Sequence, residues 1–224
     1  MTVEVVLRVW LKSVDLVTGT AYLTLRNKMG YSDRLLAIRR ADVSSFAVTC
    51  ENPEATAAAV KRMIATRSEF YNRNKHNHLL EWWWGDRAPE SQGTPLDQLL
   101  ADLARDVSQS RRPEESQEFD GKRKPERVIL GDIPIFRTEV LVEDRESFPK
   151  LALAQRLESE LGATVVTVST LGTYWYLGLR AGSESEAAAL TEEIVVSKSR
   201  DRGLLMNPNA ETFAICTVEP LLEA

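Results

Sequence analysis

The sequence is poor in the residues on which disulfide frameworks and metal sites depend. It contains two cysteines and two histidines in 224 residues. Cys50 and Cys216 each lie in a run typical of a β-strand and share no local metal-binding spacing. A chain so poor in cysteine, with no recognisable export signal, is expected in a reducing compartment, and we expect the cytoplasm.

Long apolar runs and an excess of positive charge are also lacking. No apolar run approaches the roughly 18–20 residues that cross a bilayer. The stretch 1–12 carries Glu4 and Arg8 inside its apolar run, which predicts a strand rather than a signal peptide. The formal net charge of −5 gives nucleic acid or an anionic membrane no general reason to bind. We therefore expect neither as a partner.

The sequence has none of the familiar catalytic motifs. It shows no glycine-rich phosphate loop, no Gly-x-Ser-x-Gly elbow and no His-Glu-x-x-His helix. His76 and His78 have a spacing that can bind a metal, but no cysteine or carboxylate constellation accompanies them, so exposed turn histidines are the favoured interpretation. The sequence predicts no catalytic residue, no cofactor and no metal site.

One order of elements occurs twice along the chain. Strand, helix, two short strands, helix and strand follow one another in residues 3–84 and again in residues 136–218. The two short strands are expected at 34–39 and 43–50 and, in the second copy, at 164–169 and 174–179. Turns at Ala41-Asp42 and at Leu171-Gly172 would join them. Asn52 and Pro53 predict the start of the second helix.

This order predicts an α+β protein with two tandem β-α-β-β-α-β, ferredoxin-like modules that form a pseudo-dimer. The expected boundaries are residues 1–86 for the first module, 87–131 for a linker and 132–224 for the second module. In such a module both helices lie on one face of the sheet, so the other face has to be covered. A second copy can cover it within one chain, as a homodimer does with two chains.

The linker is expected to contain an amphipathic helix at 95–108. Thr94 and Pro95 are typical of a helix start. The apolar stripe of this helix consists of Leu96, Leu99, Leu100, Leu103, Ala104 and Val107. It is either a docking helix for a partner or a helix that packs on its own modules, and the second interpretation is favoured. The polar stretch 108–125 is expected to be a mobile loop.

Aromatic residues gather on the expected strands and are the candidate interface residues. Alternation along a strand places Trp82 and Trp84 on one face and Trp83 on the other. The full set for contacts between modules or with partners is Trp10, Trp82, Trp83, Trp84, Tyr174, Trp175 and Tyr176. A sheet-to-sheet core between the modules is favoured over a ligand-stacking site. We therefore expect the modules to pack through their sheets, with these aromatic residues at the contact.

Several short motifs resemble the PurS subunit family of phosphoribosylformylglycinamidine synthase. In 11–31, a strand ending in Leu-Lys, an Asp-to-Gly turn at the helix start and a final Met-Gly-Tyr resemble the opening of that subunit. In the second module, Leu-Leu-Met-Asn-Pro at 204–208 and Gly-Thr-Tyr at 172–174 are similar to further motifs of the family. Three departures are visible: Ser13-Val14 replaces a usual Pro-Gly, the second module lacks the Asp-to-Gly turn, and the family normally has one module per chain.

The resemblance implies a non-catalytic subunit in de novo purine biosynthesis. Such a subunit holds a glutaminase subunit against an ATP-using synthetase subunit, so that ammonia passes between their sites. A fused pseudo-dimer would replace the homodimer of the family, each module could face a different partner, and the pseudo-dimer could self-associate again. The chain itself would then belong to a ligase complex without an active site of its own.

Two other functions remain open from the sequence. A tandem regulatory module of the ACT type has the same element order and binds amino acids at module interfaces, which predicts a small-molecule pocket between the repeats. A dimeric α+β barrel enzyme, either a haem-dependent or a cofactor-free oxidoreductase, would require a large pocket with His76 or His78 as ligand or base.

Overall fold

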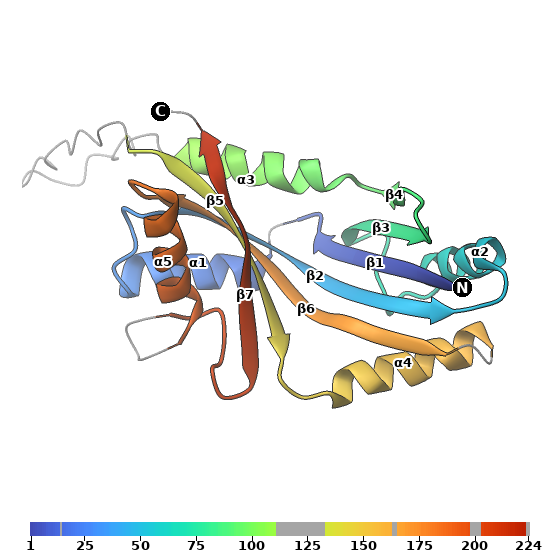
Figure 1. Cartoon of the computed structure of the whole chain (residues 1–224). Helices are drawn as coiled ribbons and strands as arrows, with labels where there is room; N and C mark the ends of the chain where they lie inside the picture. The colour runs from blue at the N-terminus through green and yellow to red at the C-terminus, as the bar shows by residue number, and fades with distance from the viewer. Residues whose placement is uncertain (14, 111–132, 163–164, 198–202, 223–224) are drawn as a thin grey trace, which may run out of the picture.

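Five helices and a seven-stranded sheet make up the described part of the chain. The structure is a computed structural model that describes residues 1–13, 15–110, 133–162, 165–197 and 203–222. In chain order its elements are β1 (Thr2–Leu11), α1 (Leu16–Lys28), β2 (Leu35–Thr49), α2 (Pro53–Thr66), β3 (His76–Trp84), β4 (Glu90–Gly93), α3 (Leu96–Ser110), β5 (Ile135–Asp144), α4 (Phe148–Leu161), β6 (Val166–Arg180), α5 (Glu184–Val195) and β7 (Glu211–Leu222). The strands are ordered β4-β3-β1-β2-β6-β5-β7, and each neighbouring pair is antiparallel (Figure 1). The expected α+β class is confirmed.

The helix ends follow the chemistry read from the sequence. The side chain of Asn52 accepts a hydrogen bond from the Ala55 N–H, and Pro53 is the first residue of α2. Asp15 caps α1 in the same manner by accepting from the Val17 N–H at 3.0 Å. Gly162 ends α4 with a φ of 74°, a backbone conformation that favours glycine. None of the described helices is long and apolar enough to cross a membrane.

The two expected hairpins are wrong, because β2 and β6 are single long strands. Each contains 15 residues and runs straight through the expected turn. Ala41 pairs with Tyr174, and Ser44 pairs with Leu171, so residues at both expected turns are paired across the two strands. A strand from the other half of the sequence thus supplies the backbone hydrogen bonds that a hairpin arm within the same half would have supplied.

Each long strand is used in two parts. Residues 42–48 of β2 pair with β1 as well as with β6, whereas in the described structure residues 35–41 pair with β6. In β6 the C-terminal part has the two neighbours: residues 172–179 pair with both β5 and β2, whereas in the described structure residues 166–171 pair with β2. The N-terminal half (residues 1–86) and the C-terminal half (residues 132–224) are therefore joined edge to edge through β2 and β6.

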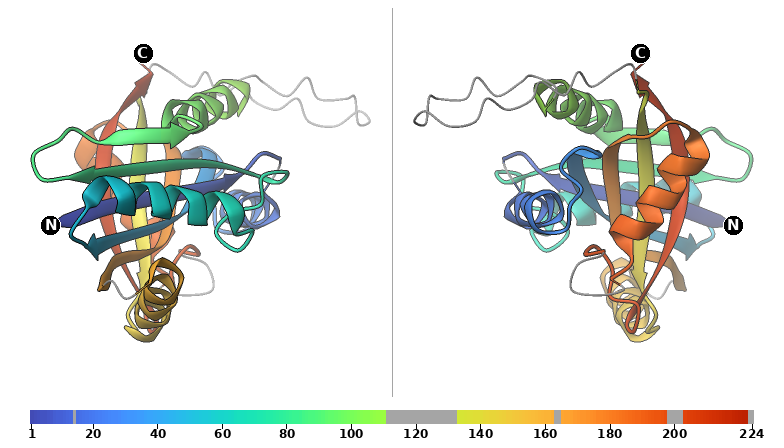
Figure 2. Two further views of the ribbon diagram at one scale, coloured as in Figure 1. Left: turned by 90° about the vertical axis from the view of Figure 1, so that its right-hand side faces the viewer. Right: turned by 90° about the vertical axis from the view of Figure 1, so that its left-hand side faces the viewer.

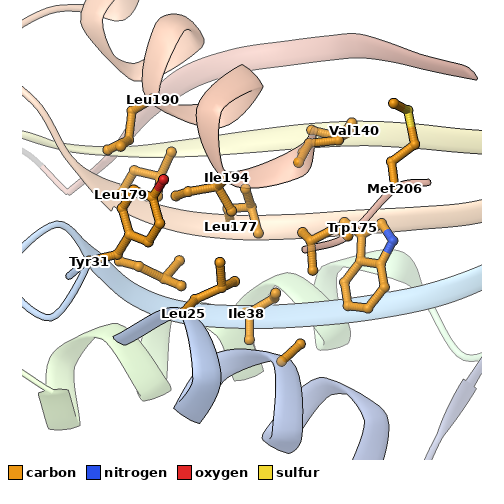
Figure 3. Packing of buried hydrophobic residues seen from close by; sticks show 14 of the residues in the cluster. Leu25, Tyr31, Ile38, Val140, Trp175, Leu177, Leu179, Leu190, Ile194 and Met206 are labelled. Carbon is orange, nitrogen blue, oxygen red and sulfur yellow. The ribbon is translucent and has the colours of Figure 1, made fainter. Parts of the chain in front are cut away.

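The helices are exchanged between the halves in the same way. One core packs α2 and α4 together, with Val60 and Ile64 from α2 and Leu157 from α4. The other core packs α1 and α5 together, with Leu25 from α1 and Ile194 from α5 (Figure 3). All five residues are at most 1% exposed. Each helical layer takes one helix from each half, as Figure 1 also shows.

This exchange corrects the expected packing of one module against the other through stacked sheets. The halves instead share one strongly twisted sheet, whose outer strands at one end run across those at the other (Figure 2). The boundaries 1–86 and 132–224 separate sequence halves, whereas the three largest hydrophobic cores each draw on both halves or on α3 between them.

The face of the sheet opposite α1 and α5 is packed by α3. Leu99, Leu103 and Val107 of this helix are at most 2% exposed and contact residues of both halves. The favoured interpretation, a linker helix that packs on its own chain, is confirmed. The helix extends to Ser110, so residues 108–110 are helical and not part of a loop. The short strand β4 lies in the expected linker, and residues 111–125 lie outside the described residues.

Candidate functional site

A groove crosses the middle of the sheet where the two halves meet. It has a volume of about 600 Å³, and a smaller pocket of about 110 Å³ adjoins it through shared lining residues. Its floor is formed by the central parts of β2 and β6, which Figure 1 shows crossing the molecule. The groove is lined by both halves at corresponding positions: Val9 and Val142 on β1 and β5, Phe70 and Leu205 in the loops, and His76 and Glu211 at the starts of β3 and β7.

Two turns with the same hydrogen bonds place His76 and Glu211 in this groove. Asn72 accepts the His76 N–H at 2.8 Å, and its own N–H donates to Nδ1 of that imidazole. Asn207 accepts the Glu211 N–H at 2.8 Å, and its N–H donates to Oε2 of that carboxylate. The side-chain oxygens of both asparagines accept a third bond from the N–H two residues later. The two turns therefore correspond to each other in their hydrogen bonding.

An ion pair lies where the smaller pocket meets the groove. Nε of Arg40 on β2 donates to Oδ2 of Asp15 at 2.5 Å. Burial alone would raise the pKa of Asp15, but hydrogen bonds from Thr18 and Arg40, the Arg40 charge and the Val17 N–H together lower it. The Arg40 guanidinium also lies 5.8 Å from the ring centre of Trp175. Asp15 thus caps α1 and fixes Arg40 at the same time.

A second arginine of the groove is also paired. Arg156 on α4 forms an ion pair with Glu69, and its guanidinium lies 5.9 Å from the ring centre of Phe70. In contrast, no Lys, Arg or His side chain in the described ranges forms an ion pair with Asp42, Asp144 or Glu211. All three of these carboxylates line the groove, which therefore carries an excess of negative charge.

Three of the tryptophans proposed as interface residues are divided between two cores. Trp82 is 5% exposed in the core of α2 and α4, and Trp84 packs against the same core. Alternation along β3, which places these two residues on one face, is thus confirmed. Trp83 is half-buried. Trp175 is 6% exposed in the core of α1 and α5.

Three other proposed interface residues meet beneath α3. Trp10 from the N-terminal half and Tyr176 from the C-terminal half are 4% and 1% exposed, and Tyr174 packs against the same cluster. The two tyrosine rings lie 6.1 Å apart. The cluster that contains them joins the halves, although through α3 and one shared sheet rather than through two stacked sheets.

Charged groups surround these tyrosines on the α3 side of the sheet. Arg8 lies 5.7 Å from the ring centre of Tyr174 and forms an ion pair with Glu81. Burial raises the pKa of Glu139, and the charges of Arg137 and Arg8 partly oppose that rise. Burial is also the largest cause of the raised pKa of Tyr176. Arg8 on β1 thus contacts both Tyr174 on β6 and Glu81 on β3.

The two histidines have different surroundings. His76 lines the groove, whereas the imidazole of His78 stacks on the Tyr71 ring with centroids 4.0 Å apart. Burial and the charges of Arg73 and Lys12 lower the pKa of His78. Within the described residues, no group of three His, Cys, Asp or Glu side chains could hold a metal ion.

Two helices expose apolar residues at corresponding places. Leu16 and Phe148, the first residues of α1 and α4, are 79% and 74% exposed. Leu23 continues the α1 surface at 57% exposure, and Leu151 continues the α4 surface at 56%. Large apolar side chains with this exposure, two on each helix, are candidate contact points for a partner. The two helices lie on opposite sides of the molecule in Figure 1.

Sequence reasoning did not identify Asp144 and Glu211 as groove residues. The signal for one of them was present, because the repeated asparagine turns place His76 and Glu211 at equivalent positions. That the groove exists depends on β2 and β6 meeting in the middle, which the expected hairpins would have prevented.

No protein-family model, curated protein or solved structure matches this chain. Its function is therefore inferred from the motifs of the sequence and from the geometry of the two apolar helix surfaces and the central groove.

Proposed function

We propose that the chain is a non-catalytic bridging subunit of phosphoribosylformylglycinamidine synthase, built from two tandem ferredoxin-like, PurS-like modules that form a pseudo-dimer. In this role it holds a glutaminase subunit and a synthetase subunit together for ammonia transfer. The observation that carries the proposal is the pair of separated apolar surfaces on α1 and α4, because a bridge needs two docking surfaces.

The motifs that resemble the PurS family support the proposal through their structural roles. Tyr31, the last residue of the first motif, is 5% exposed in the core of α1 and α5 and donates a hydrogen bond to Glu193 of α5. Asn207 of the second motif organises the turn before β7. These residues therefore stabilise the exchanged arrangement of helices and strands, which does within one chain what two chains do in a homodimer.

The bridging role is tested by reconstituting the reaction with partner subunits from the same organism. The substrates are formylglycinamide ribonucleotide, ATP and either glutamine or free ammonia. Glutamine-dependent synthesis should require this chain, because it depends on two sites being held together. Ammonia-dependent synthesis should proceed without it, because the synthetase subunit alone holds that site.

Matched surface variants sharpen the test. Leu16→Ser with Leu23→Ser, and separately Phe148→Ser with Leu151→Ser, should each reduce glutamine-dependent synthesis by tenfold or more and spare the ammonia-dependent rate. Glu51→Gln with Glu90→Gln, at exposed positions on neither helix, serves as the control. Full glutamine-dependent synthesis without this chain would refute the proposal.

A further inference from the structure

The central groove has the size and the lining of a small-molecule site. Its volume of about 600 Å³ lies within the range of about 300–1,000 Å³ that is usual for ligand pockets. Valine and leucine side chains from both halves give it apolar walls, and carboxylates lie among them. Such a mixture suits a ligand with an apolar body and charged ends.

The charges of the groove favour a cation. Its two arginines, Arg40 and Arg156, are already paired with Asp15 and Glu69. No basic side chain among the described residues forms an ion pair with the three other carboxylates, which belong to Asp42, Asp144 and Glu211. An anionic ligand would face this surplus of negative charge, whereas a cationic ligand would neutralise it.

The strand register adds a further reason, which concerns two of these carboxylates. Asp144 at the end of β5 pairs directly with Glu211 at the start of β7. Like charges directly opposite each other on neighbouring strands destabilise a sheet. At the corresponding place in the N-terminal half, Leu11 pairs with His76, so that half has no such repulsion between carboxylates. A bound cation would relieve the repulsion in the C-terminal half.

We propose that the groove binds an organic cation, an amine with an aliphatic body whose ammonium groups face Asp42, Asp144 and Glu211. Asp144 and Glu211 are paired on β5 and β7, Asp42 lies on β2 with β6 between it and that pair, and in the described structure no group of three acidic or other ligating side chains could hold one metal ion. A flexible amine with several separated charges matches such spacing better than a single ion does. This site is independent of the bridging role, since it lies in the centre of the sheet and uses neither exposed helix surface.

The two histidines of the chain provide a direct readout. Spermidine is the probe, and the imidazole signals of the full-length protein are followed by NMR during its titration. His76 lines the groove and should shift with saturation, whereas His78, stacked on Tyr71, should not. His76→Gln and His78→Gln variants assign the two signals. Added salt should weaken binding, because the attraction is electrostatic.

Two variants with equal net charge separate local from general electrostatics. Asp144→Asn with Glu211→Gln should weaken spermidine binding at least tenfold, and this variant should fold, since it removes a repulsion. Glu51→Gln with Glu90→Gln removes the same charge from exposed positions outside the groove lining and should leave binding unchanged within twofold. The uncharged 1,8-octanediol, of comparable length, should not shift His76.

Three results would overturn the proposal. They are an unshifted His76 signal at saturating spermidine, equal weakening by the two double variants, and binding of octanediol as tight as that of spermidine. Loss of bridging activity with intact spermidine binding would refute the proposed function alone, so the two failures are distinguishable.

Discussion

The Thr173 hydroxyl donates a hydrogen bond to Oδ1 of Asp42 at 3.1 Å, and this bond links the two central strands of the sheet. Asp42 pairs with Val9 of β1, and Thr173 pairs with Val142 of β5. Asp42 and Thr173 therefore occupy corresponding positions in the two halves and also face each other across β2 and β6. The halves meet at this point, and the groove lies over it.

The exchange of helices predicts that neither half folds alone. Produced separately, residues 1–110 would lack α4 and α5, and residues 133–224 would lack α1 and α2, so each fragment would expose half of each helical core. We expect no cooperative thermal transition from either fragment, and recovery of the transition when the two are mixed. Circular dichroism at increasing temperature measures this.

A chain cut within residues 111–132 after folding is the control for this experiment and should keep the transition of the intact protein. A cooperative transition from the N-terminal fragment alone, near the midpoint of the full chain, would show that the halves are independent domains.

The packing of α3 on β6 predicts a coupled pair of substitutions. A methyl group added at Gly178 would lie 2.4 Å from Cγ2 of Val107, and Val107 is fully buried. Gly178→Ala should lower the free energy of unfolding by about 1–3 kcal/mol through overpacking. Val107→Ala should lower it by about 2 kcal/mol through the void that it leaves. In the double variant the added methyl group fills part of that void. The double variant should therefore lose less free energy of unfolding than the sum of the two single losses, by roughly 1 kcal/mol.

Urea denaturation of the three variants gives these free energies of unfolding. Gly19→Ala is the matched control, because a methyl group there meets nothing within 4 Å and glycine weakens the interior of α1. It should stabilise the protein by up to about 1 kcal/mol. If the losses of unfolding free energy at positions 107 and 178 were additive, α3 would not pack on β6 as described.

The surroundings of His78 predict a pH dependence of stability. Burial and the charges of Arg73 and Lys12 hold its folded pKa below 6.5, so between the two values the unfolded chain binds more protons. Stability should therefore fall as the pH decreases from about 6.5 through the folded pKa. His78→Gln should remove this part of the dependence, and His76→Gln should retain it.

Chemical denaturation at a series of pH values between about 5 and 8 tests this sign. The difference in unfolding free energy between wild type and His78→Gln should shift in favour of the wild type as the pH rises. An unchanging difference would mean that His78 has the same pKa in both states.

Most elements of the fold follow from local sequence. Asn52 and Pro53 start α2, Gly162 ends α4, and the apolar stripe of α3 is buried as expected. These features depend on residues within one or two turns of each other, so their chemistry is visible in the sequence.

The path of β2 and β6 could not be predicted from the local sequence. Ala41-Asp42 and Leu171-Gly172 suit either a hairpin turn or an extended strand, and the choice depends on which strand lies beside them. That strand comes from about 130 residues away along the chain. Asp144 and Glu211 lie on neighbouring strands of one half, but the cavity that they share with Asp42 depends on β2 and β6 meeting in the middle of the sheet.

The most direct test of the bridging role is the mass of the complex, measured by light scattering on a sizing column with ATP and glutamine present. The wild-type chain should bring both the glutaminase and the synthetase subunit into one particle. The Leu16→Ser, Leu23→Ser variant should lose one partner and the Phe148→Ser, Leu151→Ser variant the other, because the two surfaces lie on different helices. Separate elution of the three wild-type chains would contradict the account.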